Sequence, residues 1–148
     1  MSQISQSIKI NAPLSAVFDY VTNPENWTRY VTSLVDIRNL SDDEPKAGTT
    51  FEWTYRMLGV NNDGRGRIID FEKDKEFAME MEGSFPIKET FLFTEDGTST
   101  ELTFQINYDV PGKVLGVIAD KLVVERLNVK EAVAVLNKIK DICEAGSH

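Results

Sequence analysis

Histidine and cysteine are almost absent from this chain of 148 residues, which contains one of each. The histidine is His148, the last residue, and residues 146–148 are typical of an affinity-tag remnant that takes no part in the fold. The lack of any other histidine excludes Ser-His-Asp and Cys-His catalysis, haem ligation by histidine and the usual zinc sites. We therefore expect no metal and no cofactor, and any acid–base chemistry must come from Asp, Glu, Tyr, Lys or Arg.

Long apolar runs are also missing. The longest run falls far short of the ~18 residues that a membrane-spanning helix needs, and no apolar segment follows Met1 as a secretory signal would. The lone cysteine, Cys143, has no partner for a disulfide within the chain. These features predict a cytoplasmic protein that does not insert into membranes.

Basic residues are in the minority, because 16 Lys and Arg stand against 24 Asp and Glu and give a formal net charge of −8. Nucleic-acid binding needs Lys and Arg opposite the phosphates, and an anionic membrane surface repels a chain of this charge. The charge balance therefore argues against nucleic acid as a partner. It leaves small molecules as the expected class, and it indicates no particular protein partner.

The composition that remains is that of an ordinary globular protein, with 41% apolar and 27% charged residues. A chain of this length typically forms one domain, and we assign residues 1–145 to it. No composition shift, repeat or linker divides this range.

Alternation of apolar and polar residues predicts antiparallel strands. The pattern begins in residues 4–10 and returns in six further segments, at 34–40, 50–58, 65–72, 76–82, 87–94 and 98–108. Turn signals at 61–64 (Asn-Asn-Asp-Gly) and at Asp96-Gly97 separate consecutive strands. Short connections of this kind predict a meander in which each strand pairs with the next.

Helices are predicted on either side of this meander. Helical spacing in residues 17–21 indicates one short helix, and Asn23 and Pro24 provide the N-cap and first position of a second. After Pro111-Gly112 the apolar period changes from two residues to about 3.6, which predicts one long amphipathic helix over residues 114–143.

Six segments, at residues 8–13, 17–21, 23–27, 48–51, 97–102 and 136–140, resemble the START-like superfamily, also called SRPBCC or Bet v 1-like. Within it they are similar to the bacterial polyketide cyclase/dehydrase and lipid-transport family, and the resemblance covers essentially residues 2–144. It implies an α+β helix-grip fold, a curved antiparallel sheet of about seven strands around one long C-terminal helix, with two short helices after the first strand. It also implies a cavity for a hydrophobic molecule, in a family that includes both catalysts and carriers.

One face of the predicted strands collects aromatic residues and methionines, a composition typical of small-molecule pockets. We predict a pocket lined by Phe51, Trp53, Tyr55, Met57, Phe77, Met79, Met81, Glu89, Phe91, Phe104, Ile106 and Tyr108 from the strands, and by Ile118 and Leu122 from the helix. The alternative is that these residues form an ordinary core. A ligand is expected to quench the fluorescence of Trp53 and to affect Trp27 little.

Two acidic residues fall among apolar neighbours. Glu89 shares a strand face with Ile87 and Phe91, and a carboxyl group in an apolar cavity has a raised pKa and can act as an acid. Glu125 falls in the apolar arc of the long helix. Each has a plainer alternative, a solvated cavity mouth for Glu89 and an exposed ion pair with Lys121 for Glu125.

Three functions are compatible with these patterns. The first is a carrier or sensor that binds a small hydrophobic molecule in an interior cavity. The second is an enzyme of the polyketide cyclase/dehydratase type, with Glu89, Glu125, Tyr55 and Tyr108 as proton donors and acceptors. The third is a protein-interaction module, for which a fully packed core and an exposed apolar patch are expected.

Overall fold

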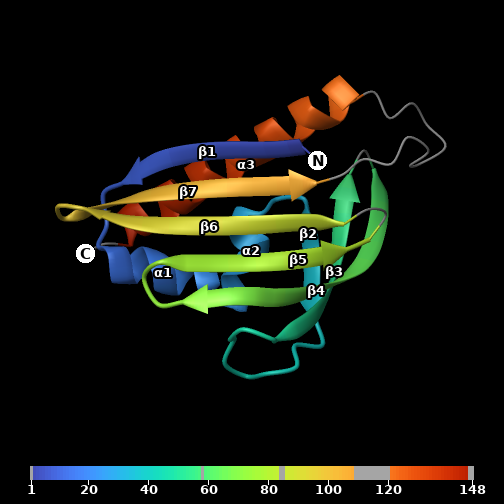
Figure 1. The fold of residues 1–148 in the computed structure, drawn as a ribbon, viewed down its shortest axis with the longest axis horizontal. Coiled ribbons are helices and arrows are strands. Elements are labelled where there is room, and N and C mark those ends of the chain that lie inside the picture. The colour runs from blue at the N-terminus through green and yellow to red at the C-terminus, as the bar shows by residue number, and fades with distance from the viewer. Residues whose placement is uncertain (1, 58, 84–85, 109–120, 147–148) are drawn as a thin grey trace.

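The computed structural model describes residues 2–57, 59–83, 86–108 and 121–146. Within them the chain forms one antiparallel sheet of seven strands and three helices (Figure 1). The elements are β1 (Ser2–Ile10), α1 (Leu14–Thr22), α2 (Pro24–Tyr30), β2 (Leu34–Arg38), β3 (Thr50–Met57), β4 (Val60–Glu72), β5 (Glu76–Glu82), β6 (Ile87–Asp96), β7 (Ser99–Tyr108) and α3 (Lys121–Ala145). This order confirms the predicted α+β helix-grip fold.

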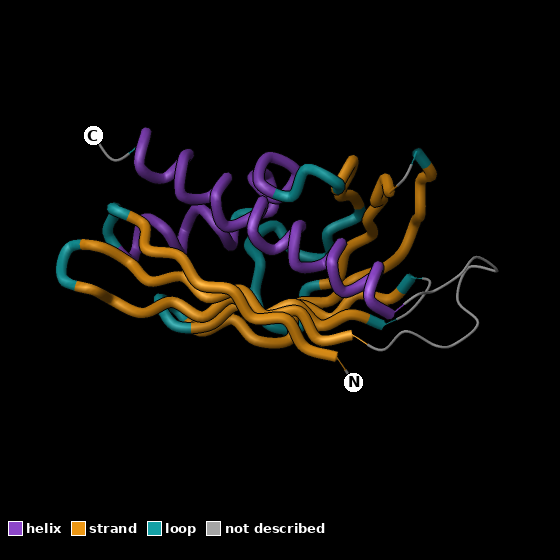
Figure 2. Tube along the Cα trace, turned by 90° about the horizontal axis from the view of Figure 1, so that it is seen from above, coloured by secondary structure: helices purple, strands orange, loops and turns teal. Residues whose placement is uncertain are grey.

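The sheet runs in the order β1-β7-β6-β5-β4-β3-β2, so β1 and β2 form its two edges. Its register places apolar residues opposite one another on one face, as where Phe91 pairs with Phe77 on one side and with Phe104 on the other. The register between β4 and β5 shifts between Ile68 and Asp70, and shifts of the β-bulge type bend a strand and increase its twist. The sheet curls, and all three helices lie on its concave side (Figure 2).

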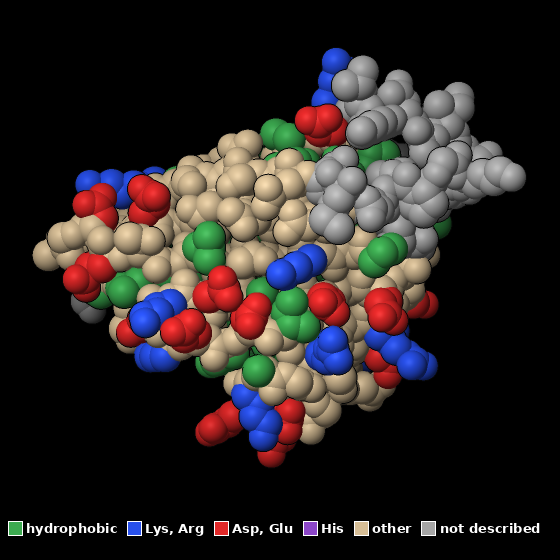
Figure 3. Space-filling view, in the orientation of Figure 1, with side chains coloured by type: hydrophobic (Ala, Val, Ile, Leu, Met, Phe, Trp, Pro, Cys, Tyr) green, Lys and Arg blue, Asp and Glu red, His purple; other side chains and the backbone are tan. Residues whose placement is uncertain are grey.

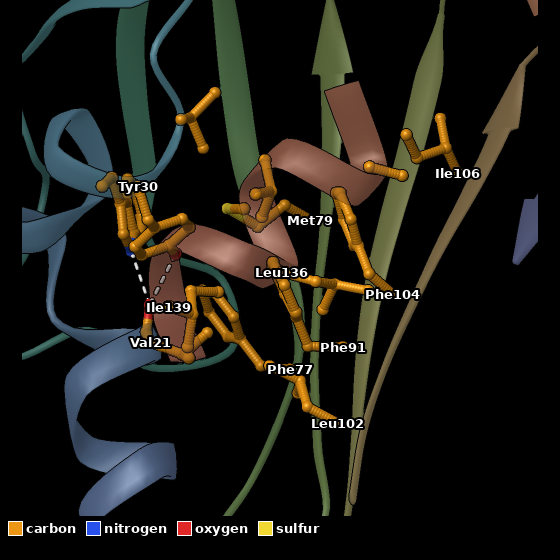
Figure 4. Close-up of a cluster of buried hydrophobic side chains, with 14 of the residues drawn as sticks. Val21, Tyr30, Phe77, Met79, Phe91, Leu102, Phe104, Ile106, Leu136 and Ile139 are labelled. Atoms are coloured by element: carbon orange, nitrogen blue, oxygen red, sulfur yellow. Dashed lines mark hydrogen bonds between the residues drawn. The ribbon is translucent and has the colours of Figure 1, made fainter. Parts of the chain in front are cut away.

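The two short helices are tied together by side-chain hydrogen bonds. Asn23 caps α2, because its Oδ1 accepts a hydrogen bond of 3.1 Å from the backbone N–H of Glu25. Two side chains of α2 then reach back to α1. Trp27 Nε1 and Tyr30 Oη both donate to the carbonyl oxygen of Val21, at 3.0 and 2.8 Å (Figure 4). These bonds fix the two aromatic rings of α2 over the sheet.

The long helix α3 packs mainly against β1. Its fully buried side chains follow a helical stripe, made of Ala132, Val135, Leu136 and Ile139. The Lys140 Nζ donates to the carbonyl oxygen of Lys9 at 2.8 Å, which ties the end of the helix to β1. The first part of the predicted helix, residues 114–120, lies outside the described residues.

The predicted turn at residues 61–64 is wrong, because these residues belong to β4. The pairing between β3 and β4 includes these residues and ends with Met57 opposite Val60. Next to this last pair, Gly59 has a φ of +79°, in the left-handed region that glycine adopts readily. Gly64 lies opposite Trp53, and a Cβ atom at Gly64 would collide with the indole ring. The glycine thus serves close packing inside a strand and does not make a turn.

The outer face of the sheet carries acidic and basic side chains side by side (Figure 3). It includes ion pairs between neighbouring strands, such as Arg67 with Glu80 at 3.3 Å. Among the helices that the structure describes, none is both long and apolar enough to cross a membrane.

Candidate functional site

A pocket opens between the concave face of the sheet and the segment formed by α2 and β2. We call it the aromatic pocket, and its walls are Trp27, Tyr30, Val31, Leu34, Ile37, Phe51, Trp53, Tyr55, Met79, Met81, Glu89, Phe91 and Phe104. Its free volume is about 20 Å³, which suffices for a single water molecule. The lining side chains therefore fill the pocket almost completely.

The aromatic rings around the pocket pack against one another. Phe91 and Phe104 are stacked with ring centroids 4.4 Å apart, and Trp27 meets Phe51 edge to face at 5.0 Å. The indole Nε1 of Trp53 donates to the carbonyl oxygen of Arg65 at 2.9 Å. Both indole N–H groups and the Tyr30 hydroxyl group are thus used by backbone carbonyls, which leaves the rings themselves as pocket wall.

Glu89 is the acidic residue of the wall. It lies on β6 between Met79 of β5 and Ile106 of β7, and only 8% of its surface is exposed. Burial raises the pKa of its carboxyl group to about 8, and the negative charge of Glu131 contributes in the same direction. At neutral pH this carboxyl group is mostly protonated, so it can donate as well as accept a hydrogen bond.

A second acid, Glu131, approaches the same region from α3. Its Oε1 atom is buried and has no hydrogen-bond partner among the residues described. Burial raises the pKa of Glu131, against the opposing effect of a hydrogen bond with the Ser33 side chain. The pKa of Tyr55 is also raised well above its usual value, by burial first and then by the charges of Glu89 and Glu131. Glu89 and Tyr55 thus form one polar end of an otherwise apolar pocket, and Glu131 is near enough to raise the pKa of both.

The predicted pocket residues fall into three groups. Those that line the pocket are Phe51, Trp53, Tyr55, Met79, Met81, Glu89, Phe91 and Phe104. Those that are buried in the core away from it are Phe77, Ile106 and Tyr108, of which Tyr108 keeps a buried hydroxyl group without a described partner. The side chains of Met57, Ile118 and Leu122 lie outside the described residues. Contact with a ligand stays a prediction for every one of them.

Glu125 is exposed on α3, which agrees with the plainer of its two alternatives and not with a place in the cavity. The inward-facing acid of the helix is Glu131, which sequence analysis missed. The lining residues of α2 and β2 were also missed, and Trp27 stands in the wall together with Trp53, although only Trp53 was expected there. A signal was available for α2, since Trp27 and Tyr30 are spaced by three residues on one helical face.

The chain belongs to the polyketide cyclase / dehydrase and lipid transport family, whose model matches residues 1–144. This confirms the resemblance found in the sequence. No curated protein matches the chain.

Several solved structures share the fold at low sequence identity. The protein TTHA0849 from Thermus thermophilus is 18% identical with a TM-score of 0.82, over 99% of this chain and all (100%) of the other. The Zhui aromatase/cyclase from a Streptomyces species is 15% identical with a TM-score of 0.80, over 99% of each chain. A START superfamily protein from Mycobacterium smegmatis is 16% identical with a TM-score of 0.70, over 95% of this chain and 98% of the other.

Proposed function

We propose that the chain binds a small hydrophobic molecule in the aromatic pocket, as a carrier or sensor. The observation that carries this proposal is an aromatic, apolar pocket with one buried carboxyl group, Glu89, in its wall. Apolar walls with a few placed polar groups are typical of small-molecule sites. Membership of a family named for polyketide cyclisation and lipid transport supports the same conclusion.

The small free volume means that a ligand must displace side chains in order to enter. Met79 and Met81 are suited to this, because methionine has three rotatable bonds and adapts to irregular shapes. The flank formed by β2 is the weakest part of the wall. This edge strand has five residues, pairs only with β3 among the described strands, and is irregular between Leu34 and Asp36. We therefore propose that the ligand enters along β2.

The second candidate function is that of a cyclase/dehydratase-type enzyme, and Glu89 is the observation that favours it. A carboxyl group with a pKa of about 8 is protonated at neutral pH, so it can give a proton to a ligand oxygen. The resulting carboxylate can then take a proton from a neighbouring carbon atom. Tyr55 lies in the same wall and is the second residue able to hydrogen-bond the reacting group.

The remaining cysteine does not add to this chemistry. Burial raises the pKa of Cys143 to about 11, so the thiol is protonated at neutral pH and unreactive. A free, half-buried thiol is compatible with the cytoplasm, and a cytoplasmic location stays a prediction.

Binding is tested by titrating the protein with fatty acids and polycyclic aromatic compounds while tryptophan fluorescence is recorded. Trp27→Phe and Trp53→Phe variants each leave one tryptophan, and a saturable change in both variants is expected because both rings line the pocket. No saturable change across the panel would contradict the proposal and favour a packed core.

The two candidate functions are separated with Glu89→Gln. With an uncharged ligand, a carrier variant should retain affinity and has no turnover to lose, whereas an enzyme variant should bind its substrate and lose catalysis. Candidate polyketide-like substrates identified by binding are the ones to test for turnover.

A further inference from the structure

The polar end of the aromatic pocket carries acids without any matching base. Glu89 is more than nine-tenths buried and lines the pocket, and no hydrogen bond or ion pair links it to another described residue. Glu131 is not in the pocket lining, but its charge raises the pKa of Glu89, and its buried Oε1 atom has no hydrogen-bond partner among the described residues. None of the described residues that line the pocket is Lys, Arg or His. A buried acid without a partner costs free energy, so the site is suited to a group that supplies the missing donor.

The rest of the wall restricts what that group can be. The polar hydrogens of Trp27, Tyr30 and Trp53 all point to backbone carbonyls, so they are not available to a ligand oxygen. The rings that remain present π systems, which attract cations at their faces. Apart from the Tyr55 hydroxyl group and the acids themselves, the pocket therefore offers acceptors and π systems.

On the basis of the proposed function, we propose that the ligand is a hydrophobic amine whose ammonium group lies beside Glu89 and Glu131, with its apolar part among the aromatic rings. The proton balance is simple. A neutral amine takes the proton of the Glu89 carboxyl group, or an ammonium ion binds while that proton goes to water, and both routes end in the same ion pair. The net charge of −8 favours the approach of a cation.

Three compounds with the same naphthalene ring and similar side chains test the proposal, namely naphthylethylamine, naphthylethanol and the carboxylic acid naphthaleneacetic acid. Calorimetry gives their affinities, and NMR of the indole N–H signals reports whether each compound occupies the pocket. The amine should bind at least about tenfold more tightly than the alcohol at about pH 8, since only the amine gains a charge-assisted hydrogen bond. The acid should bind most weakly.

The pH dependence of amine binding is a second measurement and needs no variant. Amine affinity should rise by up to about tenfold per pH unit from about pH 6 and level off above about pH 8, because Glu89 must be ionised in the complex. Below that pH, binding should release up to about one proton, seen as a dependence of the heat on the buffer. Glu131 from α3 is the other titratable group that raises the pKa of this carboxyl group, and the charge of Glu89 in turn raises the pKa values of Tyr55 from β3 and Tyr30 from α2.

Glu89→Gln and Glu131→Gln assign the effect to residues. Each should reduce the preference for the amine over the alcohol, Glu89→Gln by about tenfold or more, while the alcohol affinity stays within about twofold. The matched control is Glu125→Gln, which removes an exposed carboxylate from the same helix as Glu131 and should change neither affinity.

The outcomes separate this proposal from the one on which it rests. Equal binding of amine and alcohol, or an amine preference that survives both substitutions, would overturn the amine and leave hydrophobic binding in place. If none of the three compounds binds and the wider apolar panel also fails, both proposals are wrong. An amine preference that depends on pH and on Glu89 would support both.

Discussion

Glu89 makes the stability of the folded chain depend on pH in a direction that the structure determines. Its pKa is 4.5 in a solvated reference and about 8 in the folded protein. The folded state therefore holds this proton more tightly than the unfolded state. The stabilisation is fully present below the unfolded pKa and is lost as the pH rises through the folded pKa.

The size of the effect follows from the same two pKa values. At about 1.4 kcal/mol per pH unit, the carboxyl group should lower the free energy of unfolding by about 4 kcal/mol between about pH 5 and pH 9. That is a large part of the 5–15 kcal/mol or so that typically holds a domain together. Glu89→Gln replaces the acid with a neutral side chain of the same shape, so it should remove this dependence.

The contribution of Glu89 to the pH dependence is measured by urea unfolding of the wild type and of Glu89→Gln at a series of pH values. All other titrating groups are shared by both proteins, so the difference between them reports Glu89 together with its electrostatic coupling to Glu131. This difference should move in favour of the variant by about 4 kcal/mol from about pH 5 to pH 9. Glu125→Gln, at an exposed position, should run parallel to the wild type. A difference that stays constant within about 1 kcal/mol would refute the reasoning and indicate a solvated Glu89.

Two further predictions concern the local structure that holds the pocket. Gly64→Ala should lower the free energy of unfolding by about 2 kcal/mol or more and should shift Trp53 fluorescence, because the new Cβ would collide with the indole ring and with the carbonyl oxygen of Glu82. Urea unfolding measures the loss, and a loss below about 0.5 kcal/mol would contradict the packing described. Asn23→Ala should cost about 1 kcal/mol, measured by thermal unfolding, and Asn23→Asp should restore most of it, since both Asn and Asp accept from the Glu25 N–H.

The overall fold was predictable because its signals are long and redundant. Seven alternating segments, short connections and one change of period together define a meander followed by a helix. The start of β4 was not predictable in this way. Asn-Asn-Asp-Gly is a strong local turn signal, but pairing with β3 along residues 60–67 outweighs it, and Gly64 is required there by the Trp53 ring. The turn propensity of these four residues is outweighed by tertiary packing, and packing often determines strand structure in this way.

The two acids show why a strand was easier to interpret than a helix. On a strand a side chain has only two faces, so the face shared with Ile87 and Phe91 left two alternatives for Glu89, the cavity or its solvated mouth, and the structure shows Glu89 buried. On a helix the apolar periodicity gives the direction of a side chain around the helix axis. It does not show which turns of the helix are covered by other elements. Glu125 shares its arc with Val129 and Ala132, but among the helix side chains that the structure describes, from residue 124 on, the first buried one is Asn128.

Glu131 lies beside the buried stripe of α3, and its side chain is hydrogen-bonded to Ser33, the residue just before β2. No pattern in the helix alone could show that partner, because α2 and β2 come from the other end of the chain. The result is a buried acid, Glu89, near a half-buried one, Glu131, and the pKa values of both are raised. Folding alone gives no reason for such a pair, since apolar side chains of similar size are often as stable or more so. Violations of this kind concentrate at functional sites, and this one lies at the polar end of the aromatic pocket.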